Sequence, residues 1–283
     1  MGERIRSRSV SNLSGKSLSI GGRIPTPLRL IQHTLRDNPF PVDLSFPPGQ
    51  NTVMVGFLIW DFDGTLGYRE GLWSSALLTV LEARGGHPGF DAQRLRAELR
   101  AGFPWHTPEA PHAQLSSPEL WWEALSPVFV RAFEPGGLDP TTSRTLASRV
   151  REVYTDPNYW RLFDDTLSAL QTLSSRGWTH LVLSNHVPEV ARIIDALGLG
   201  DHVERVFNSA DSGHEKPHPL AFENLLEALD RPGKIWMIGD NPEADIRGAE
   251  AAGIPAILVR GRPDGAKRHC RDLFGVADIV GQA

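Results

Sequence analysis

The sequence feature that most constrains the fold is an apolar run, residues 53–60, that ends at two aspartates, Asp61 and Asp63. A short apolar run bounded by turn residues is typical of a buried strand. Because successive strand side chains point to opposite faces, the two aspartates point the same way and Phe62 points the other way. Gly64 then allows a tight turn beside the carboxylates. A buried strand that ends in two carboxylates is typical of an active site in an open α/β sheet.

The composition is that of a globular protein with a large core. The chain has 283 residues, of which 40% are hydrophobic and 22% are charged. Its formal net charge of −5 argues against nucleic acid as the main partner. Cys270 is the single cysteine, so an intrachain disulfide is impossible and we expect a reducing compartment, the cytoplasm. No apolar run approaches the ~20 residues of a membrane helix, so we expect no membrane partner.

Residues 1–50 differ in composition from the rest of the chain. They hold seven basic residues against three acidic ones and are rich in serine and proline. Such a segment buries too little apolar surface to offset its ordering entropy, so we expect a disordered extension. Arginine- and serine-rich composition also suits an organellar transit peptide. A further alternative is that Met54 is the natural start and the extension is upstream sequence.

Residues 68–159 interrupt the pattern that begins at Asp61, and their spacing predicts helices. In the first of these, apolar residues recur at i, i+3, i+4 and i+7 from Trp73, the period of one helix face. The expected helices cover residues 73–80, 91–100, 121–128 and 141–154. We expect no strand in this segment and interpret it as an all-helical insert.

From residue 156 onward, predicted strands alternate with predicted helices. The expected strands are residues 179–183, 203–207, 234–238 and 256–259, with a further candidate at 277–280. This alternation predicts a parallel sheet with helices on both faces. The fold class is therefore α/β, a Rossmann-like parallel sheet core with an inserted all-helical domain.

Polar side chains gather where the predicted strands end. They are Asp61, Asp63, Ser184, Asn185, Lys216, Asp240 and Asp245. Because the carboxyl ends of parallel strands meet at one edge of a sheet, these residues converge there. Carboxylates at one edge repel each other and favour a hard divalent cation, and oxygen-only ligands favour Mg²⁺. The cation and Lys216 together would form a pocket for a dianion such as phosphate.

Four short motifs, in this order, resemble those of the haloacid dehalogenase-like (HAD) superfamily. They are Asp61-Phe62-Asp63-Gly64-Thr65-Leu66, Leu183-Ser184-Asn185, Lys216-Pro217-His218-Pro219 and Gly239-Asp240-Asn241-Pro242-Glu243-Ala244-Asp245. The resemblance spans residues 54–283 and implies a Rossmann-like core with a helical C1 cap that closes over the substrate. We therefore expect the core at residues 51–67 and 160–283 and the cap domain at residues 68–159.

The resemblance also implies the chemistry. Asp61 would be the nucleophile that forms an aspartyl-phosphate, and Asp63 would be the general acid and then the general base. Asp61, Asp240 and the main-chain carbonyl of Asp63 would hold Mg²⁺. The expected reaction is Mg²⁺-dependent hydrolysis of a phosphate monoester, a small phosphorylated metabolite.

The remaining motif residues would bind the phosphate and support the site. The resemblance implies that Ser184 and the backbone N–H of Asn185 bind the phosphoryl oxygens. Lys216 would neutralise charge at the nucleophile and the phosphate. Asp245 would hold Lys216 or a metal-bound water.

The motifs leave rival functions open. A sugar phosphomutase uses the same aspartates and a similar cap, and a regulatory module can retain the fold without turnover. A haloacid dehalogenase needs no metal and typically lacks the second aspartate, so Asp63 and Asp240 argue against it. Trp105, His106 and His186 are candidate substrate contacts, although each also fits a packing role. The sequence leaves the substrate and the oligomeric state open.

Overall fold

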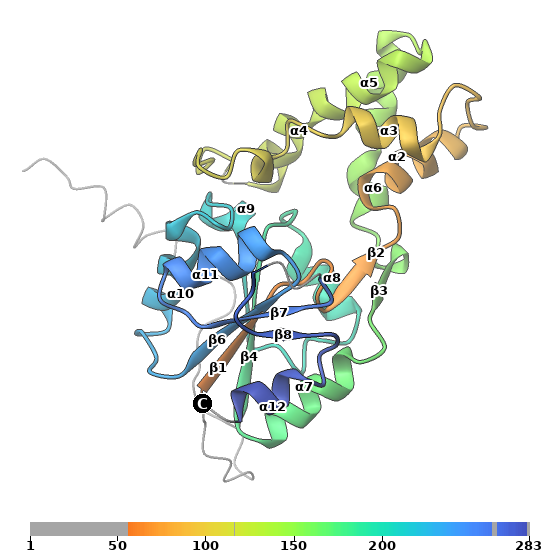
Figure 1. Cartoon of the computed structure of the whole chain (residues 1–283). Coiled ribbons are helices and arrows are strands. Elements are labelled where there is room, and N and C mark those ends of the chain that lie inside the picture. The colour runs from red at the N-terminus through yellow and green to blue at the C-terminus, as the bar shows by residue number, and fades with distance from the viewer. Residues whose placement is uncertain (1–55, 116, 262–264, 282–283) are drawn as a thin grey trace, which may run out of the picture. The chain divides into compact units, whose positions relative to one another are not determined.

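Six parallel strands form the central sheet in the order β5-β4-β1-β6-β7-β8 (Figure 1). They are β1 (Gly56–Trp60), β4 (Trp178–Ser184), β5 (Arg205–Asn208), β6 (Ile235–Gly239), β7 (Ala256–Val259) and β8 (His269–Cys270). The computed structural model describes residues 56–115, 117–261 and 265–281. The predictions for residues 1–50 and for the first residues of the 53–60 run lie outside this described part.

The sheet is covered on both faces, as the expected α/β class requires. Leu58 and Trp60 of β1 belong to a core cluster that includes the apolar residues of α7, α8 and α12. Phe57 and Ile59, on the opposite face, pack with the apolar residues of α10 and α11. The alternation of the two sets follows the two-residue period of a strand, and Figure 1 shows the two helical layers on either side of β1. The fold is therefore a Rossmann-like three-layer α/β arrangement.

The helices that cover the sheet follow its strands in the chain. They are α7 (Thr166–Ser175), α8 (Val190–Ala196), α9 (Ser209–Ser212), α10 (Pro219–Ala228), the π-helix η4 (Pro242–Arg247), α11 (Gly248–Ala251) and α12 (Val276–Val280). The C-terminal part differs from the prediction in two ways. Residues 277–280, expected as a strand, form α12, and the edge strand β8 was not expected. A short apolar run fits a buried helix as well as a strand, which explains the first error.

The helical insert, defined here as residues 70–159, lies between two short strands that pair antiparallel, β2 (Gly67–Arg69) and β3 (Trp160–Leu162). Its helices are α2 (Leu72–Glu82), α3 (Ala92–Glu98), α4 (Pro118–Phe133), α5 (Pro140–Ala147) and α6 (Val150–Tyr154), with 3₁₀ turns η1 (Pro104–His106), η2 (Glu134–Gly136) and η3 (Pro157–Tyr159). The expectation of no strand from residue 68 onward was wrong, since Tyr68 and Arg69 belong to β2. That the insert forms a separate cap domain stays a prediction.

Aromatic side chains hold the insert together. Trp73 of α2 stacks on Tyr154 of α6, with 3.6 Å between ring centroids and an interplanar angle of 7°. Trp73 also contacts Phe103 and Phe129, at centroid distances of 4.8 and 5.5 Å.

Within the described residues, no helix combines the length and the apolar character that crossing a membrane requires.

Candidate active site

β1 carries Asp61 to the carboxyl edge of the sheet. The Asp61 N–H donates to the Ile238 carbonyl at 2.9 Å, which continues the pairing with β6 beyond the strand. The chain then turns back, because the Gly67 N–H donates to the Phe62 carbonyl at 3.0 Å and Asp63 forms an isolated bridge with Gly67. Asp61 is buried and retains 8% of its surface.

Gly64 is required by this turn for two reasons. Its φ of 93° lies in the left-handed region that favours glycine. A Cβ at this position would also lie 2.6 Å from Oδ2 of Asp240, closer than real Cβ contacts. The neighbouring Thr65 hydroxyl donates to Oδ1 of Asp240 at 3.4 Å. The turn after β1 therefore packs directly against the carboxylate that follows β6.

Lys216 joins two of the carboxylates. Its Nζ lies 2.8 Å from Oδ1 of Asp61 and 2.7 Å from Oδ1 of Asp245. Burial acts to lower the pKa of Lys216, but the carboxylates of Asp245 and Asp61 outweigh it and raise that pKa above its usual value. Lys216 is therefore a fixed positive charge beside Asp61.

Asn185 positions Lys216 through its side chain. The Asn185 amide donates to the Lys216 carbonyl at 2.8 Å and accepts from the Lys216 N–H at 2.7 Å. This two-point contact was not predicted, because the motif reading used only the Asn185 backbone. Ser184 ends β4, and its buried Oγ has no hydrogen-bond partner among the described residues. An unpaired buried hydroxyl is what a phosphoryl-binding group would show without its ligand.

Asp245 reaches the site because of the π-helix η4. The N–H groups of Asp245 and Ile246 both donate to the Asn241 carbonyl, at 3.0 and 3.3 Å. In return, Oδ2 of Asp245 accepts the Asn241 N–H at 3.0 Å. A Cβ on Gly239 would lie 2.1 Å from Oδ2 of Asp245, so a side chain there would displace this carboxylate. Asp245 contacts Lys216, as one of the two expected roles requires.

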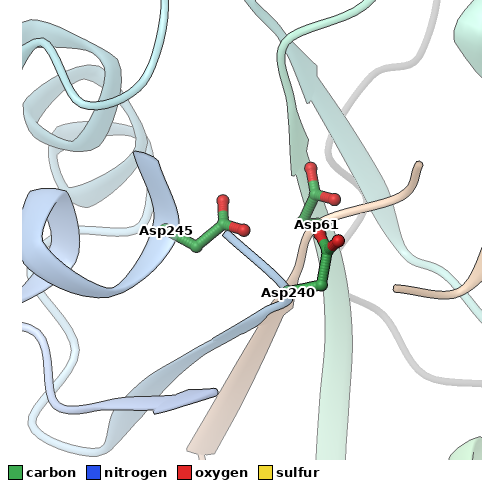
Figure 2. A group of neighbouring side chains, drawn as sticks. All are labelled: Asp61, Asp240 and Asp245. Carbon is green, nitrogen blue, oxygen red and sulfur yellow. The ribbon is translucent and has the colours of Figure 1, made fainter. Parts of the chain in front are cut away.

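Three carboxylates form a group that fits a metal ion. One oxygen from each of Asp61, Asp240 and Asp245 lies within 4.8 Å of the others (Figure 2). Burial and the nearby Asp61 and Asp240 carboxylates raise the pKa of Asp63 to about 8. Burial, Asp61 and Asp245 raise the pKa of Asp240 to about 7, even though Lys216 opposes this. Ionising all of these carboxyls would place more negative charge here than Lys216 alone offsets, and an oxygen-rich donor set of this kind suits Mg²⁺.

The comparison with protein families decides the assignment. A family model of the haloacid dehalogenase-like hydrolases matches residues 57–253, which include all seven site residues. The chain belongs to this family.

Relatives within the haloacid dehalogenase-like family agree with the fold. The chain is 34% identical over 225 residues to the phosphoserine phosphatase of Thermus thermophilus, covering 71% of this chain and 87% of that protein. It is 28% identical over 148 residues to the haloacid dehalogenase-like hydrolase domain-containing protein 3 of Bos taurus, covering 52% and 58%. The solved structure of the HAD-hydrolase YfnB from Bacillus subtilis superposes with a TM-score of 0.60 at 18% identity, covering 81% of this chain and 99% of that one. With the family match, the phosphatase relative shows that this chain is an enzyme of the phosphatase type.

The three candidate substrate contacts lie in different surroundings. Trp105 and His106 pack against Phe103 in the insert, at ring-centroid distances of 4.8 and 5.5 Å. His186 is fully enclosed beside Trp160, at a centroid distance of 5.1 Å, and neither ring nitrogen has a partner among the described residues. Burial lowers the pKa of His186 to about 3, so its imidazole is neutral. None of the three contacts is tested by the family match.

Two further residues beside the site were missed. Tyr154 ends α6, and its pKa is raised by burial and by the carboxylate of Asp63, so the phenol interacts with Asp63. Arg69 belongs to β2 and is almost completely buried. An isolated arginine and a helix-end tyrosine carry no spacing that distinguishes them in the sequence. Each requires the three-dimensional structure to be recognised.

Proposed function

We propose that this chain hydrolyses a small phosphate monoester in a Mg²⁺-dependent reaction through an aspartyl-phosphate. The observation that carries the proposal is the position of Lys216 Nζ between Asp61 and Asp245, next to the Asp240 carboxylate. A carboxylate is a weak nucleophile toward a phosphate dianion, so positive charge must lie beside it. Lys216 supplies that charge at Oδ1 of Asp61.

The proposed reaction has two steps. An oxygen of Asp61 attacks phosphorus, the bond to the leaving alcohol breaks, and Asp63 gives its proton to the leaving oxygen. Asp63 then takes a proton from water, and that water attacks the aspartyl-phosphate and releases inorganic phosphate. A carboxyl group whose pKa is raised, as that of Asp63 is, can hold the proton that the first step needs. In this proposal, Ser184 at the end of β4 and the N–H of Asn185 bind the phosphoryl oxygens.

Mg²⁺ would be held by Asp61, Asp240 and the main-chain carbonyl of Asp63. When bound there, it offsets the negative charge of the carboxylates and of the phosphate. Asp245 stays with Lys216 and the Asn241 N–H, so its role in this proposal is to hold the lysine.

A small substrate is favoured by the contacts that join the insert to the core. Trp122 of α4 donates through Nε1 to the Glu189 carboxylate, at 3.1 and 3.2 Å. His112 Nε2 lies 2.9 Å from Oε1 of Glu215, the residue before Lys216. Through these contacts the insert lies against Glu189 and Glu215 of the core, and in this proposal it restricts the site to a small substrate. A soluble metabolite in the cytoplasm remains our expectation for the substrate.

The test is hydrolysis of p-nitrophenyl phosphate by the full chain, with Mg²⁺ and with EDTA. We expect turnover with Mg²⁺, loss of turnover with EDTA, and loss of turnover in Asp61→Asn. The matched control is Asp201→Asn, an exposed aspartate in the loop after α8, which should retain wild-type activity. Metal-independent hydrolysis, or turnover that survives the loss of Asp61, would contradict the proposed mechanism.

A further inference from the structure

Arg69 is a buried cation whose donors lack acceptors. Its side chain is 3% exposed, and Nε and Nη2 have no hydrogen-bond partner among the described residues. A buried polar group without a partner costs free energy, more for a charged group than for a neutral one. Such a group in a native structure requires an explanation. Neither the reaction proposed above nor the packing of the sheet uses this guanidinium.

Arg69 lies on the antiparallel ribbon that β2 and β3 form, on the face that packs against Phe62. β2 has the burial pattern buried, exposed, buried, so Gly67 and Arg69 share one face. A Cβ on Gly67 would lie 3.1 Å from the ring of Phe62, the residue between the two catalytic aspartates. Arg69 pairs with Trp160 of β3, whose ring lies 5.6 Å from that of Phe62. The shared face therefore packs toward the ring of Phe62 and the aromatic residue Trp160.

The neighbours of Arg69 connect it to Asp63. Its Cζ lies 5.7 Å from the ring centroid of Tyr154 and 4.6 Å from that of Tyr159. Tyr154 interacts electrostatically with both Asp63 and Arg69. Asp156 also interacts electrostatically with Arg69, although the two form no ion pair. The guanidinium thus contacts Tyr154, whose phenol also interacts electrostatically with the proposed general acid.

The two unpartnered nitrogens indicate the shape of the missing acceptor. Nε and Nη2 lie on the same edge of the planar guanidinium, and a carboxylate accepts two parallel hydrogen bonds from such an edge. We propose that Arg69 is a specificity residue that binds a carboxylate on the leaving group, so that the substrate is the phosphate ester of a hydroxy acid. This inference rests on the proposed phosphatase function.

A carboxylate fits this position better than a second phosphate does. One guanidinium balances one negative charge. A phosphate dianion would leave an uncompensated negative charge beside Tyr154, which already interacts with the Asp63 carboxyl. A substrate with a second phosphate is therefore the alternative outcome of the test.

The experiment compares esters that differ by the carboxylate alone. Kinetics of the full chain are measured with O-phosphoserine against O-phosphoethanolamine, and with 3-phosphoglycerate against glycerol 3-phosphate. Fructose 1,6-bisphosphate against fructose 1-phosphate tests a second phosphate. p-Nitrophenyl phosphate reports the chemical step without a carboxylate. The variants are Arg69→Met, Arg69→Lys, and the control Arg161→Met, an exposed arginine on the paired strand.

For wild type we expect higher kcat/KM for the carboxylate member of at least one pair. Arg69→Met should lower that value by about 10- to 100-fold, mainly through KM, because two charge-assisted hydrogen bonds are lost. Its activity on O-phosphoethanolamine and p-nitrophenyl phosphate should change little. Arg69→Lys should retain part of the preference, since it keeps the charge and loses the two-bond geometry. Arg161→Met should behave as wild type.

Four results would overturn the inference. The first is an equal loss by Arg69→Met on both members of each pair, with a parallel loss on p-nitrophenyl phosphate, which would indicate a structural role. The second is wild-type turnover of p-nitrophenyl phosphate without preference for either carboxylate. The third is a preference for the bisphosphate that Arg69→Met removes. The fourth is the absence of Asp61-dependent turnover of p-nitrophenyl phosphate. This result would refute the proposed function itself, whereas the first three results refute only the role of Arg69.

Discussion

Lys216 decides how the charges of the site balance. It is buried, its Nζ contacts two carboxylates, and Asn185 fixes its backbone from both sides. A buried ion pair contributes little net stability when it is complete, but removing one partner leaves the other charge buried and uncompensated. The same side chain thus determines both the folding stability of this edge of the sheet and the charge at the nucleophile.

Lys216→Met tests both roles at once. We expect kcat/KM for p-nitrophenyl phosphate to fall by at least about 100-fold, because the positive charge beside Asp61 is lost. The free energy of unfolding should fall by about 3–5 kcal/mol, measured by urea denaturation. Lys267→Met removes an exposed lysine paired with Glu250 and should change stability by less than about 0.5 kcal/mol. A Lys216→Met protein of wild-type stability and activity would refute this account of the ion pair.

Replacing Asp61 and replacing Asp63 should affect different steps of the proposed reaction. Asp63→Asn leaves the Asp61 nucleophile and Lys216 in place but removes the group that activates water. We expect phosphoenzyme to accumulate with an activated aryl phosphate, and steady-state turnover to fall by about 100- to 10,000-fold. Acid-quench trapping of labelled phosphate on the protein measures this, and Asp61→Asn should trap none. Equal labelling of both variants would exclude the assigned division of roles.

Among the elements, the strands that carry the site were the most predictable. β1, β4 and β6 are apolar runs ended by polar residues, and that pattern alone indicates where each carboxylate or hydroxyl emerges. The π-helix η4 was not predicted, because a widened turn depends on the Asn241 carbonyl accepting two N–H groups rather than on residue spacing. The ribbon of β2 and β3 was also not predicted, because an alternation of buried and exposed residues cannot be recognised over strands of three residues.

His180 shows a contact within the sheet that no pattern indicates. On β4, its Nδ1 accepts from Trp60 Nε1 of β1 at 3.0 Å, and its Nε2 lies 3.0 Å from the Leu170 carbonyl. The acceptor role of Nδ1 assigns the proton to Nε2, so the ring is neutral. Burial lowers the pKa of His180 from 6.5 to about 4. Protonation in the folded state would break the Trp60 hydrogen bond.

This contact predicts a stability that depends on pH. The unfolded chain takes up the His180 proton near pH 6.5 and the folded chain only near pH 4. The stabilisation is therefore fully present above pH 6.5 and is lost as the pH falls toward 4, by up to about 3 kcal/mol. His180→Asn keeps an acceptor for Trp60 and does not titrate in this range. In urea unfolding, this variant should lose less stability than wild type between pH 7.5 and 4.5.

The control for that prediction is His269→Asn, which replaces an exposed histidine on the edge strand β8. It should follow the wild-type dependence on pH. An unchanged slope in His180→Asn would mean that His180 does not contribute to the acid sensitivity of the fold.

At the scale of the whole described molecule, the contacts between the insert and the core could not be predicted from the sequence. His112 and Glu215 are separated by 103 positions, and Trp122 and Glu189 by 67. Both members of the first pair are buried, and Oε2 of Glu215 has no further partner among the described residues. Pairing at such separations follows from the completed fold and leaves no local signal.

The His112–Glu215 contact predicts how strongly the insert is held. His112→Ala leaves a buried carboxylate without its partner, so we expect a loss of about 1–3 kcal/mol in unfolding free energy. We also expect a higher KM for p-nitrophenyl phosphate and faster proteolysis within residues 103–115. His87→Ala removes a histidine elsewhere in the insert and serves as the control. Wild-type protease resistance in His112→Ala would show that this contact does not fasten the loop.

The antiparallel ribbon of β2 and β3 has a consequence for how such a protein changes over evolutionary time. The chain departs from the sheet through one strand of the ribbon and returns through the other, about 5 Å away. Whatever lies beyond the ribbon can lengthen, shorten or be exchanged, because its two attachment points remain neighbours. The register of β1 with β4 and β6 does not depend on it. Selection can therefore alter the segment that meets new compounds while the carboxylates at the sheet edge stay where they are.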